Sequence, residues 1–405
     1  MDRETKLKLT VKVAKAFSPS APVDQSKLFA GRLDEVSEVI NAVMQRGQHA
    51  IIYGERGVGK TSLANVLSDF LSRVGLDGLD SVIINCDGTT NFSSLWHKIC
   101  RQMSVVNQSE RMGFSPGTED TTVFLDSLLP KKVTPDDVRV LFGRVSAPTI
   151  IVDEMDRIED RKTTTLLADT VKTLSDHSVD TTLILVGVAD SVDGLIAEHR
   201  SIERALVQVR MPRMSRSELF EIIDKGLDEA GMTIDDGAKQ QIADLSQGLP
   251  HFTHLLGLHA AQHAIGEERK RLTEEDVKVA IHHAVAKTQQ STVNIYHHAT
   301  SSPRKNLYTQ VLLACAMSEK DELGYFSAAD VRGPMSAIMG QTYGIPTFAR
   351  HLNDFCEKQR GPVLQKTGHE RRFRYRFINP MMEPFVTMNG LDNGLITEGM
   401  LNGSS

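Results

Sequence analysis

One short stretch of the sequence combines three glycines, a lysine and a threonine in a spacing that suits phosphate binding. Its glycines would let the backbone wrap an anion with N–H groups pointing inward, and a helix starting near Lys60 would add partial positive charge. We expect Lys60 to reach the β- and γ-phosphates of a nucleotide and the Thr61 hydroxyl to ligate Mg²⁺. The alternative is a glycine-rich turn between a strand and a helix. The residues expected to contact the nucleotide here are Gly54, Glu55, Arg56, Gly57, Val58, Gly59, Lys60, Thr61 and Ser62.

An acidic pair follows the apolar run of residues 149–152. Asp153 and Glu154 would lie at the carboxyl end of a buried strand, where α/β sheets place ligand chemistry. Asp153 is predicted to hold Mg²⁺ through water, and Glu154 to orient and deprotonate a water that attacks the γ-phosphate. Acids after a strand can instead cap the next helix, and Asp156 fits that simpler role. With the glycine-rich loop upstream, the pair predicts hydrolysis of a nucleoside triphosphate.

Between about residues 28 and 212, short apolar runs alternate with helical patterns. The runs cover residues 49–53, 81–85, 149–152 and 182–187. Apolar strands separated by helices predict a parallel sheet covered on both faces, and therefore an α/β core. Between about residues 102 and 137 the chain is polar and contains glycine and proline, which predicts a loop or a helical insertion.

The sequence before and after the core shows different patterns, which predict further structural units. Residues 1–27 lack sustained periodicity and are interpreted as an N-terminal arm, part of which could order against the next domain. Helical patterns alone follow the core, and Ser215 with Glu218 forms a capping box at the first of them. A stretch rich in Ser, Thr and His around residues 289–303 is interpreted as a linker. The expected boundaries are 1–27 for the arm, 28–212 for the core, 213–290 for a helical lid, 291–388 for a third domain and 389–405 for a tail.

The sequence pattern of the third domain predicts three helices followed by a basic hairpin, which is the arrangement of a winged helix. Because side chains alternate along a strand, Phe373, Tyr375 and Phe377 should face one way and the intervening arginines the other. On this interpretation the third helix reads the major groove, and basic residues meet phosphates. A charged edge strand that discourages aggregation, or a winged helix that docks a protein, would also fit. The expected DNA contacts are Arg350, Lys366, Arg371, Arg372, Arg374 and Arg376, with Thr347, His351 and Asn353 on or near the reading face.

These residues resemble the AAA+ ATPases, particularly the branch of origin-recognition and replication-initiator proteins. The resemblance covers about residues 28–385. It rests on the segment Leu28-Phe29-Ala30-Gly31-Arg32 with Glu35, the glycine-rich loop, Asp153-Glu154-Met155-Asp156, and the order of core, lid and winged helix. It implies the P-loop NTPase AAA+ fold and the cofactors ATP and Mg²⁺. ATP is implied because the segment around Arg32 would lie against the adenine.

The same resemblance implies three further nucleotide contacts. Asp190, after the strand that follows the acidic pair, occupies the place of the first sensor. In the lid, His251 stands where initiators carry an arginine that touches the γ-phosphate, and as a titratable substitute it implies slow turnover. Arg200 and Arg204 occupy the region that supplies a cation to a neighbouring subunit's nucleotide, although either could belong to a solvated helix face.

Composition narrows the class of protein. The formal net charge of -6 excludes a uniformly basic nucleic-acid binder, so any DNA contact must come from a local patch. The four cysteines lack the close spacing of zinc or redox motifs, and no run of about 20 apolar residues predicts a membrane span, so we expect a cytoplasmic protein. The sequence predicts an ATP-hydrolysing switch that binds double-stranded DNA and acts as a homo-oligomer or with a partner protein. The alternative is a regulatory ATPase of a signalling or defence system whose winged helix docks a protein effector.

Overall fold

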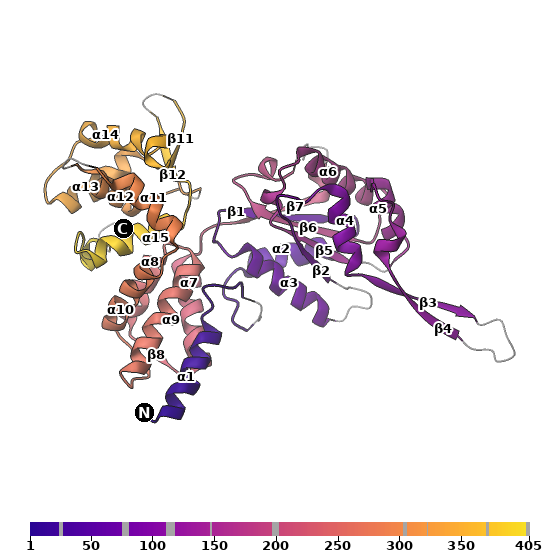
Figure 1. The fold of residues 1–405 in the computed structure, drawn as a ribbon, viewed down its shortest axis with the longest axis horizontal. Coiled ribbons are helices and arrows are strands. Elements are labelled where there is room, and N and C mark those ends of the chain that lie inside the picture. The colour runs from indigo at the N-terminus through magenta and orange to yellow at the C-terminus, as the bar shows by residue number, and fades with distance from the viewer. Residues whose placement is uncertain are drawn as a thin grey trace. The chain divides into compact units, whose positions relative to one another are not determined.

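A computed structural model describes the chain except for residues 24–26, 75–80, 111–117, 146–147, 197–201, 303–305, 322, 370–371 and 402–405. The chain divides into two compact units, coloured along the sequence in Figure 1. One unit, the α/β unit, contains residues 22–55 and 60–211. The other, the helical unit, contains residues 1–21, 56–59 and 212–405. Among the described residues, no helix has the length and apolar character needed to cross a membrane.

The α/β unit is built on a five-stranded parallel sheet. Its strand order is β2-β5-β6-β1-β7. The four predicted strands are confirmed, and a fifth strand, β7, lies at the edge beside β1. The bounds are β1 His49–Gly54, β2 Ser81–Asn85, β5 Thr149–Asp153, β6 Thr182–Val188 and β7 Leu206–Met211. The strands β1, β2, β5 and β6 therefore direct their carboxyl ends, and the residues that follow, to one edge of the sheet.

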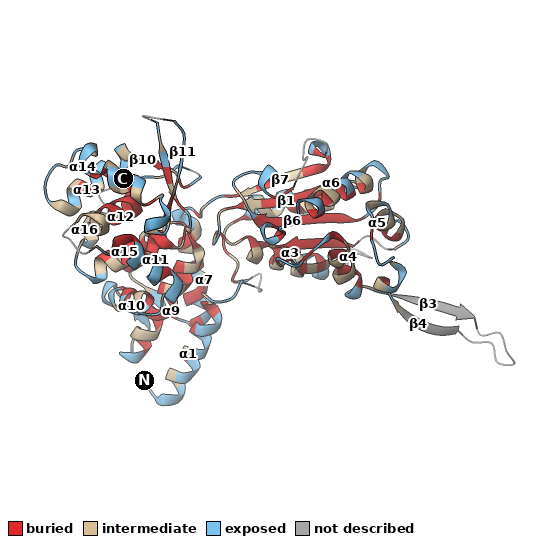
Figure 2. Ribbon diagram, turned by 45° about the horizontal axis from the view of Figure 1, so that its top comes forward, coloured by how far each residue is buried: buried red, intermediate tan, exposed pale blue. Residues whose placement is uncertain are grey.

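Helices cover both faces of this sheet. Helices α2 (Leu33–Val43) and α3 (Lys60–Val74) lie along one face, and α4 (Phe92–Arg101), α5 (Pro135–Phe142) and α6 (Arg161–Asp176) cover the other (Figure 1). The fully buried rings of Trp96 and Phe142 pack together beneath α4 and α5, and the buried sheet shows in red in Figure 2. Both faces of the sheet are buried, as the continuous apolar strands predict.

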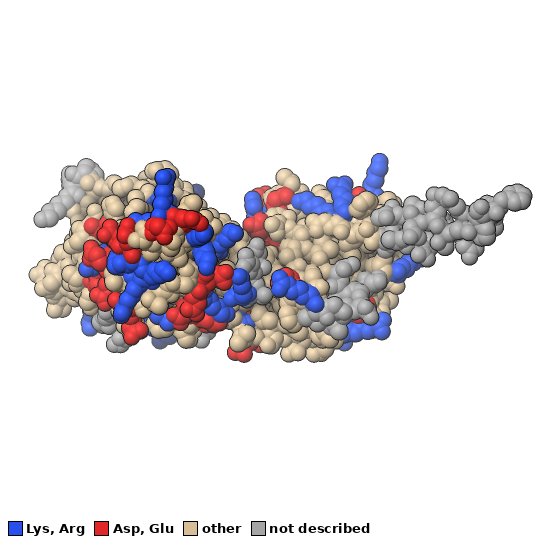
Figure 3. Space-filling view, turned by 90° about the horizontal axis from the view of Figure 1, so that it is seen from below, with Lys and Arg blue, Asp and Glu red and all other residues tan. Residues whose placement is uncertain are grey.

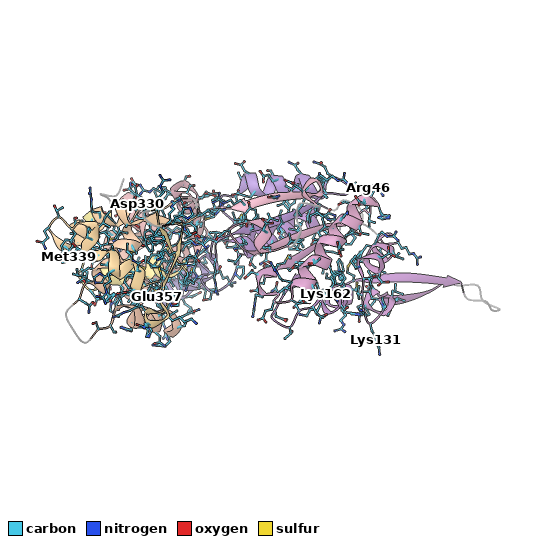
Figure 4. All side chains as sticks on the ribbon, turned by 90° about the horizontal axis from the view of Figure 1, so that it is seen from above. Arg46, Lys131, Lys162, Asp330, Met339 and Glu357 are labelled. Carbon is cyan, nitrogen blue, oxygen red and sulfur yellow. The ribbon has the colours of Figure 1, made fainter. Side chains whose placement is uncertain are left out.

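The predicted insertion is a β-ribbon rather than a loop or a helix. Strands β3 (Ser104–Glu110) and β4 (Thr118–Phe124) pair antiparallel, with Ser104 opposite Phe124. The ribbon projects from the α/β unit after α4 and returns to the 3₁₀ turn η1 (Leu125–Leu128) (Figure 1). Lys131 lies at the surface a few residues beyond this turn (Figure 4). The helical alternative was wrong because β3 contains two valines and β4 contains threonines, a valine and a phenylalanine, residue types that favour strands.

A helical bundle forms the first part of the helical unit. It contains α7 (Arg216–Ala230), α8 (Asp236–Ser246), α9 (Pro250–Gly266) and α10 (Glu274–Ala286), with a short parallel pair of β8 (Thr233–Ile234) and β9 (Arg271–Leu272). The predicted capping box of Ser215 and Glu218 begins α7. These elements position residue His251 in the first turn of α9.

The N-terminal segment forms helix α1 (Arg3–Ala16), which packs against α7 and α9 of the bundle. Phe17, fully buried, fills a notch between those two helices. A Cβ atom at Gly226 would lie 2.5 Å from its ring, and one at Gly257 would lie 2.6 Å from it. The absence of side chains at these two glycines therefore lets α1 dock, and the expected arm is largely an integral helix of the bundle.

The remaining part of the helical unit combines helices with a small antiparallel sheet of order β10-β12-β11. A capping box of Ser327 with Asp330, which is labelled in Figure 4, begins helix α13. Two expectations are corrected: a helix, α11, occupies the presumed linker, and α15 extends into the presumed tail. The elements are α11 Gln290–Thr300, α12 Tyr308–Met317, β10 Phe326–Ser327, α13 Ala328–Met339, α14 Ile345–Asp354, β11 Leu364–Thr367, β12 Arg374–Phe377, α15 Met382–Asp392 and α16 Glu398–Leu401.

Candidate functional site

The glycine-rich loop joins the end of β1 to the start of α3. Gly54, Gly57 and Gly59 have φ angles of 153°, 90° and 97°, a region that residues with a Cβ rarely occupy. At Gly54 the requirement is also steric, because a Cβ atom would lie 2.3 Å from the carbonyl oxygen of Met211. The loop therefore has the backbone conformation that an anion-wrapping turn needs, placed ahead of a helix N-terminus.

Lys60, the first residue of α3, is buried and its side chain bends back over the loop. Its Nζ donates to the carbonyl oxygens of Gly54 at 3.1 Å and Glu55 at 2.8 Å. Nearby, the Ser62 hydroxyl accepts a hydrogen bond from the backbone N–H of Val23 at 3.1 Å. The ammonium group is thus held within the loop that would surround the phosphates.

Asp153, the last residue of β5, is buried and incompletely bonded. Its Oδ1 accepts the Glu154 N–H at 2.7 Å, while its Oδ2 has no hydrogen-bond partner among the described residues. Burial raises the pKa of this carboxyl, and the Thr61 hydroxyl and the Glu154 N–H act in the opposite direction. A buried carboxylate oxygen without a partner, next to a hydroxyl, fits Mg²⁺, which prefers oxygen ligands.

Glu154 has a left-handed backbone with φ 57° and begins the 3₁₀ turn η2 (Met155–Arg157). Its Oε2 is 3.2 Å from Nη1 of Arg157, an ion pair that sequence analysis missed although the i,i+3 spacing signals it. Asp156, for which helix capping was the alternative, accepts the backbone N–H of Val188 at 2.8 Å. The turn that contains Asp153, Glu154 and Asp156, called the acidic turn below, is therefore hydrogen-bonded to the end of the neighbouring strand β6.

Two of the implied nucleotide contacts occupy different environments within the α/β unit. Arg32 precedes α2 with φ 62°, is buried, and forms an ion pair with Glu35 at 3.0 Å. Asp190 is exposed two residues after β6. Both residues lie where the resemblance implies them along the chain, and their contact with a nucleotide stays a prediction.

The cation implied for a neighbouring subunit's nucleotide is highly exposed. The Arg204 side chain is 85% exposed, and its Nη2 is 3.3 Å from the Asp176 carboxylate. A single exposed pair of this kind contributes little to stability, so the guanidinium can exchange it for another anion at small cost. The other candidate, Arg200, lies outside the described residues.

His251 is half-buried in the first turn of α9. Its Nδ1 donates to the carbonyl oxygen of Pro19 at 2.8 Å, and burial lowers its pKa. The neutral tautomer with a proton on Nδ1 leaves Nε2 as an acceptor. In this state the ring does not reproduce the positive charge of the arginine that the resemblance places here.

The basic strand β12 shows the predicted alternation. Tyr375 and Phe377 are buried, whereas the arginines point away from that core. Arg374 forms an ion pair with Asp321 at 2.9 Å, and the guanidinium carbon of Arg376 lies 4.8 Å from the centre of the Tyr325 ring. These two arginines therefore also hold the neighbouring turn that precedes β10.

The other predicted DNA contacts are distributed over α14 and the hairpin. The Arg350 side chain is 87% exposed and lies 3.7 Å from the Asp354 carboxylate. Lys366 donates to Oδ1 of Asn353 at 3.0 Å, which links β11 to α14. Arg372 is exposed, while Arg371 lies outside the described residues.

One residue expected near the reading face points into the protein instead. The ring of His351 packs on Tyr308 with centroids 4.7 Å apart, and burial lowers its pKa. Thr347 and Asn353 are exposed. The periodicity of α14 explains the difference, because His351 lies three residues after the buried Phe348 and shares its side of the helix.

Known proteins resemble this chain in one domain and in its fold. Residues 43–196 match the family model described as AAA domain. No curated protein matches the sequence. Similar solved structures include the Aeropyrum pernix ORC2 protein in ADPNP and ADP complexes (14% identity, 96% of this chain and 98% of that chain, TM-score 0.51) and the Walker-type ATPase PABY2304 of Pyrococcus abyssi (15%, 92% and 99%, 0.51). At these identities the similarity shows the fold, which is that of the P-loop AAA+ ATPases.

Proposed function

We propose that this chain, whose residues 43–196 form an AAA domain in a P-loop AAA+ fold, binds ATP with Mg²⁺, hydrolyses the ATP slowly and uses the cycle to switch its binding of DNA. The observation that carries the ATPase part is the buried Asp153 carboxylate, one residue before Glu154, whose Oδ2 has no hydrogen-bond partner among the residues that the structure describes. A charged group with an unsatisfied oxygen is costly to bury, which favours a site that gains its partner on ligand binding.

Thr61 and Asp153 would hold the magnesium ion, which when bound neutralises charge on the phosphate oxygens. The backbone N–H groups between Gly54 and Thr61 would bind the phosphates. Lys60 would exchange its bonds to the Gly54 and Glu55 carbonyl oxygens for the β- and γ-phosphates. Arg32, Asp190 and His251 remain proposed nucleotide contacts.

Glu154 would act as the general base in hydrolysis. Water attacks the γ-phosphorus, its proton passes to the Glu154 carboxylate, the bond between the γ-phosphorus and the bridging oxygen breaks, and ADP and phosphate leave. Glu154 forms an ion pair with Arg157 at 3.2 Å, so accepting the proton requires the carboxylate to share or leave that guanidinium. The exposed Arg204 would serve a neighbouring copy in a homo-oligomer, or a partner protein.

Glu154→Gln tests the ATPase proposal. We expect fluorescent ATP to bind as in the wild type, while turnover falls by about 10²-fold to 10⁴-fold, because the amide cannot take the proton. Lys60→Ala should lose nucleotide binding itself. Glu159→Gln, which neutralises an exposed acid in the same segment, should leave both properties unchanged. Unchanged hydrolysis in Glu154→Gln would remove this residue from its role.

We also propose that residues 291–388 form a winged-helix domain that binds double-stranded DNA, with residues 28–212 as the core and 213–290 as the lid. Support comes from three helices, α12 to α14, followed by the hairpin of β11 and β12, whose outer face carries arginines. The exposed Arg350, Lys366 and Arg372 are the cations available to phosphates. Fluorescence anisotropy with a generic duplex tests this part, and the absence of binding at low salt would exclude it.

A further inference from the structure

The carboxyl end of strand β6 is bonded on both of its sides. On one side, the Ala189 N–H donates to the carbonyl oxygen of Gly54, the last residue of β1, at 3.3 Å. On the other side, the Val188 N–H donates to Oδ1 of Asp156 at 2.8 Å. The first bond belongs to the parallel pairing of β1 with β6, whereas the second comes from a side chain.

The side-chain bond is needed because the two strands part at this point. The pairing of β5 with β6 ends at Val152 opposite Leu185. Beyond it, β5 enters the acidic turn, and Glu154 adopts its left-handed φ of 57°. A non-glycine residue in that region is strained and persists when its surroundings hold it. The Asp156 carboxylate is the group that connects this turn to β6 after the backbone pairing has ended.

The packing around the bond supports a close approach. At Gly187, a Cβ atom would lie 3.3 Å from the backbone nitrogen of Asp156 and 2.6 Å from Cδ2 of the buried Leu195. Because glycine has no side chain, the acidic turn can pack closely against β6 at this position. Met155, the residue between Glu154 and Asp156, is 1% exposed and packs its side chain into the hydrophobic core of the α/β unit.

We propose that Asp156 is a positioning residue that fixes Glu154 relative to the phosphate loop and to Asp190, by bonding the acidic turn to the Val188 N–H at the end of β6. This inference rests on the proposed ATPase function. The carboxylate of Asp156 need not touch the nucleotide. Its effect passes through the backbone of residues 154–156 and of residues 188–190, so that loss of one hydrogen bond shifts the base and the sensor candidate together.

The test compares variants that differ in the acceptor at position 156. Asp156→Ala removes the acceptor, and Asp156→Glu keeps the charge but moves it by one methylene. Asp156→Asn keeps a carbonyl oxygen in place. We expect kcat to fall by about 10-fold to 100-fold in Asp156→Ala, to fall less in Asp156→Glu and to be close to wild type in Asp156→Asn, with KM for ATP changed by less than about twofold throughout.

A matched control comes from Asp160, which caps helix α6 by accepting the Lys162 N–H at 3.0 Å and, within the described part of the chain, makes no hydrogen bond or ion pair with β6. Asp160→Ala should lower stability without changing kcat. Hydrogen exchange of the peptide covering residues 183–190 gives a second readout: its protection should fall in Asp156→Ala and be retained in Asp156→Asn and Asp160→Ala.

The outcomes separate this inference from the ATPase proposal. A wild-type chain that turns over no ATP contradicts the proposed function, and hydrogen exchange still tests the bond at position 156. Turnover in the wild type together with an unchanged kcat in Asp156→Ala contradicts the positioning role alone. Equal losses in Asp156→Asn and Asp156→Ala would show that charge, rather than the bond to Val188, is what matters, and would also overturn the proposal.

Discussion

His49 begins strand β1, five residues before the phosphate loop, and is fully buried. Its Nδ1 accepts the Leu183 N–H at 3.0 Å, so the neutral ring joins the first residues of β1 and β6. Burial lowers the pKa of His49 from its ordinary value of 6.5 to about 4. A protonated ring would lose this acceptor and place an unpaired charge in the sheet.

A pH dependence of stability follows from this shift. Below pH 6.5 the unfolded chain takes up a proton at His49, whereas the folded chain does not until about pH 4, so stability present above pH 6.5 is lost as the pH falls. Between pH 7 and pH 5 the loss should be roughly 2 kcal/mol. The measurement is the free energy of urea unfolding of the α/β unit in the wild type and in His49→Asn, which cannot titrate. Parallel pH profiles for the two proteins would contradict this assignment.

Local patterns predicted where single residues lie in the fold when a few neighbouring positions encode the pattern, while their roles stay predictions. The glycine-rich loop and the acids at the end of an apolar strand needed only residues 54–61 and 149–154. The bonds of Asp156 and His49 could not be predicted in this way, because their partners Val188 and Leu183 lie on another strand and are backbone groups that any residue would supply.

At the scale of elements, strands that contain an unbroken apolar run were predictable, and strands that mix apolar with polar residues were not. Such runs mark β1, β2, β5 and β6, although β2 lies at an edge of the sheet and is partly exposed. The edge strand β7 contains Gln208 and Arg210 between its apolar residues, and β3 and β4 are polar for most of their length. Helix α1 was not predicted because the exposed Leu7 and Val11 obscure the periodicity of its buried stripe, which consists of Leu9, Val13 and Ala16.

A buried ionic cluster joins elements that are distant in sequence within the helical unit. Glu383 of α15 is 0% exposed and accepts two hydrogen bonds from Arg213, at 2.9 and 3.1 Å, while Lys320 lies 3.5 Å away. Burial would raise the pKa of Glu383, but the positive charges of Lys320 and Arg213 lower it below its ordinary value. Arg213 also donates to the carbonyl oxygen of Gln247 at 3.4 Å, just before the turn that leads to His251.

Arg213→Met should therefore destabilise α15 and the bundle together. Removing one partner of a buried pair leaves a charge without full compensation and costs about 3–5 kcal/mol. Arg216→Met, which breaks the pair between the exposed Arg216 and the partly buried Asp244, should cost less than Arg213→Met and serves as the control, because the Arg216 guanidinium lies largely in solvent. Hydrogen exchange in α15 as a function of urea measures both. Equal effects of the two substitutions would show that the buried cluster does not stabilise the packing of α15 on the bundle.

Charge at the scale of the whole molecule opposes nonspecific binding of DNA. The net charge is -6, and on the face drawn in Figure 3 the basic and acidic residues of the helical unit lie interleaved. Long-range attraction to a duplex is therefore weak, and affinity must come from short-range contacts to phosphates. Which cations make those contacts depends on whether their charge is already offset within the protein.

Arg372 and Arg374 offer a useful comparison for this question, since Arg374 begins strand β12 and Arg372 lies two residues before it. Arg374 is paired with Asp321 at 2.9 Å, whereas Arg372 makes no side-chain hydrogen bond or ion pair within the described part of the chain. If the hairpin binds the backbone of a duplex, each phosphate contact contributes about 0.9 to the slope of log affinity against log salt concentration. Arg372→Ala should reduce the slope by about that amount, and Arg374→Ala by less than half of it, because Asp321 already offsets the charge of Arg374 in the wild type. Anisotropy titrations across a salt series measure both slopes, and equal reductions would mean that Arg374 leaves Asp321 to bind phosphate.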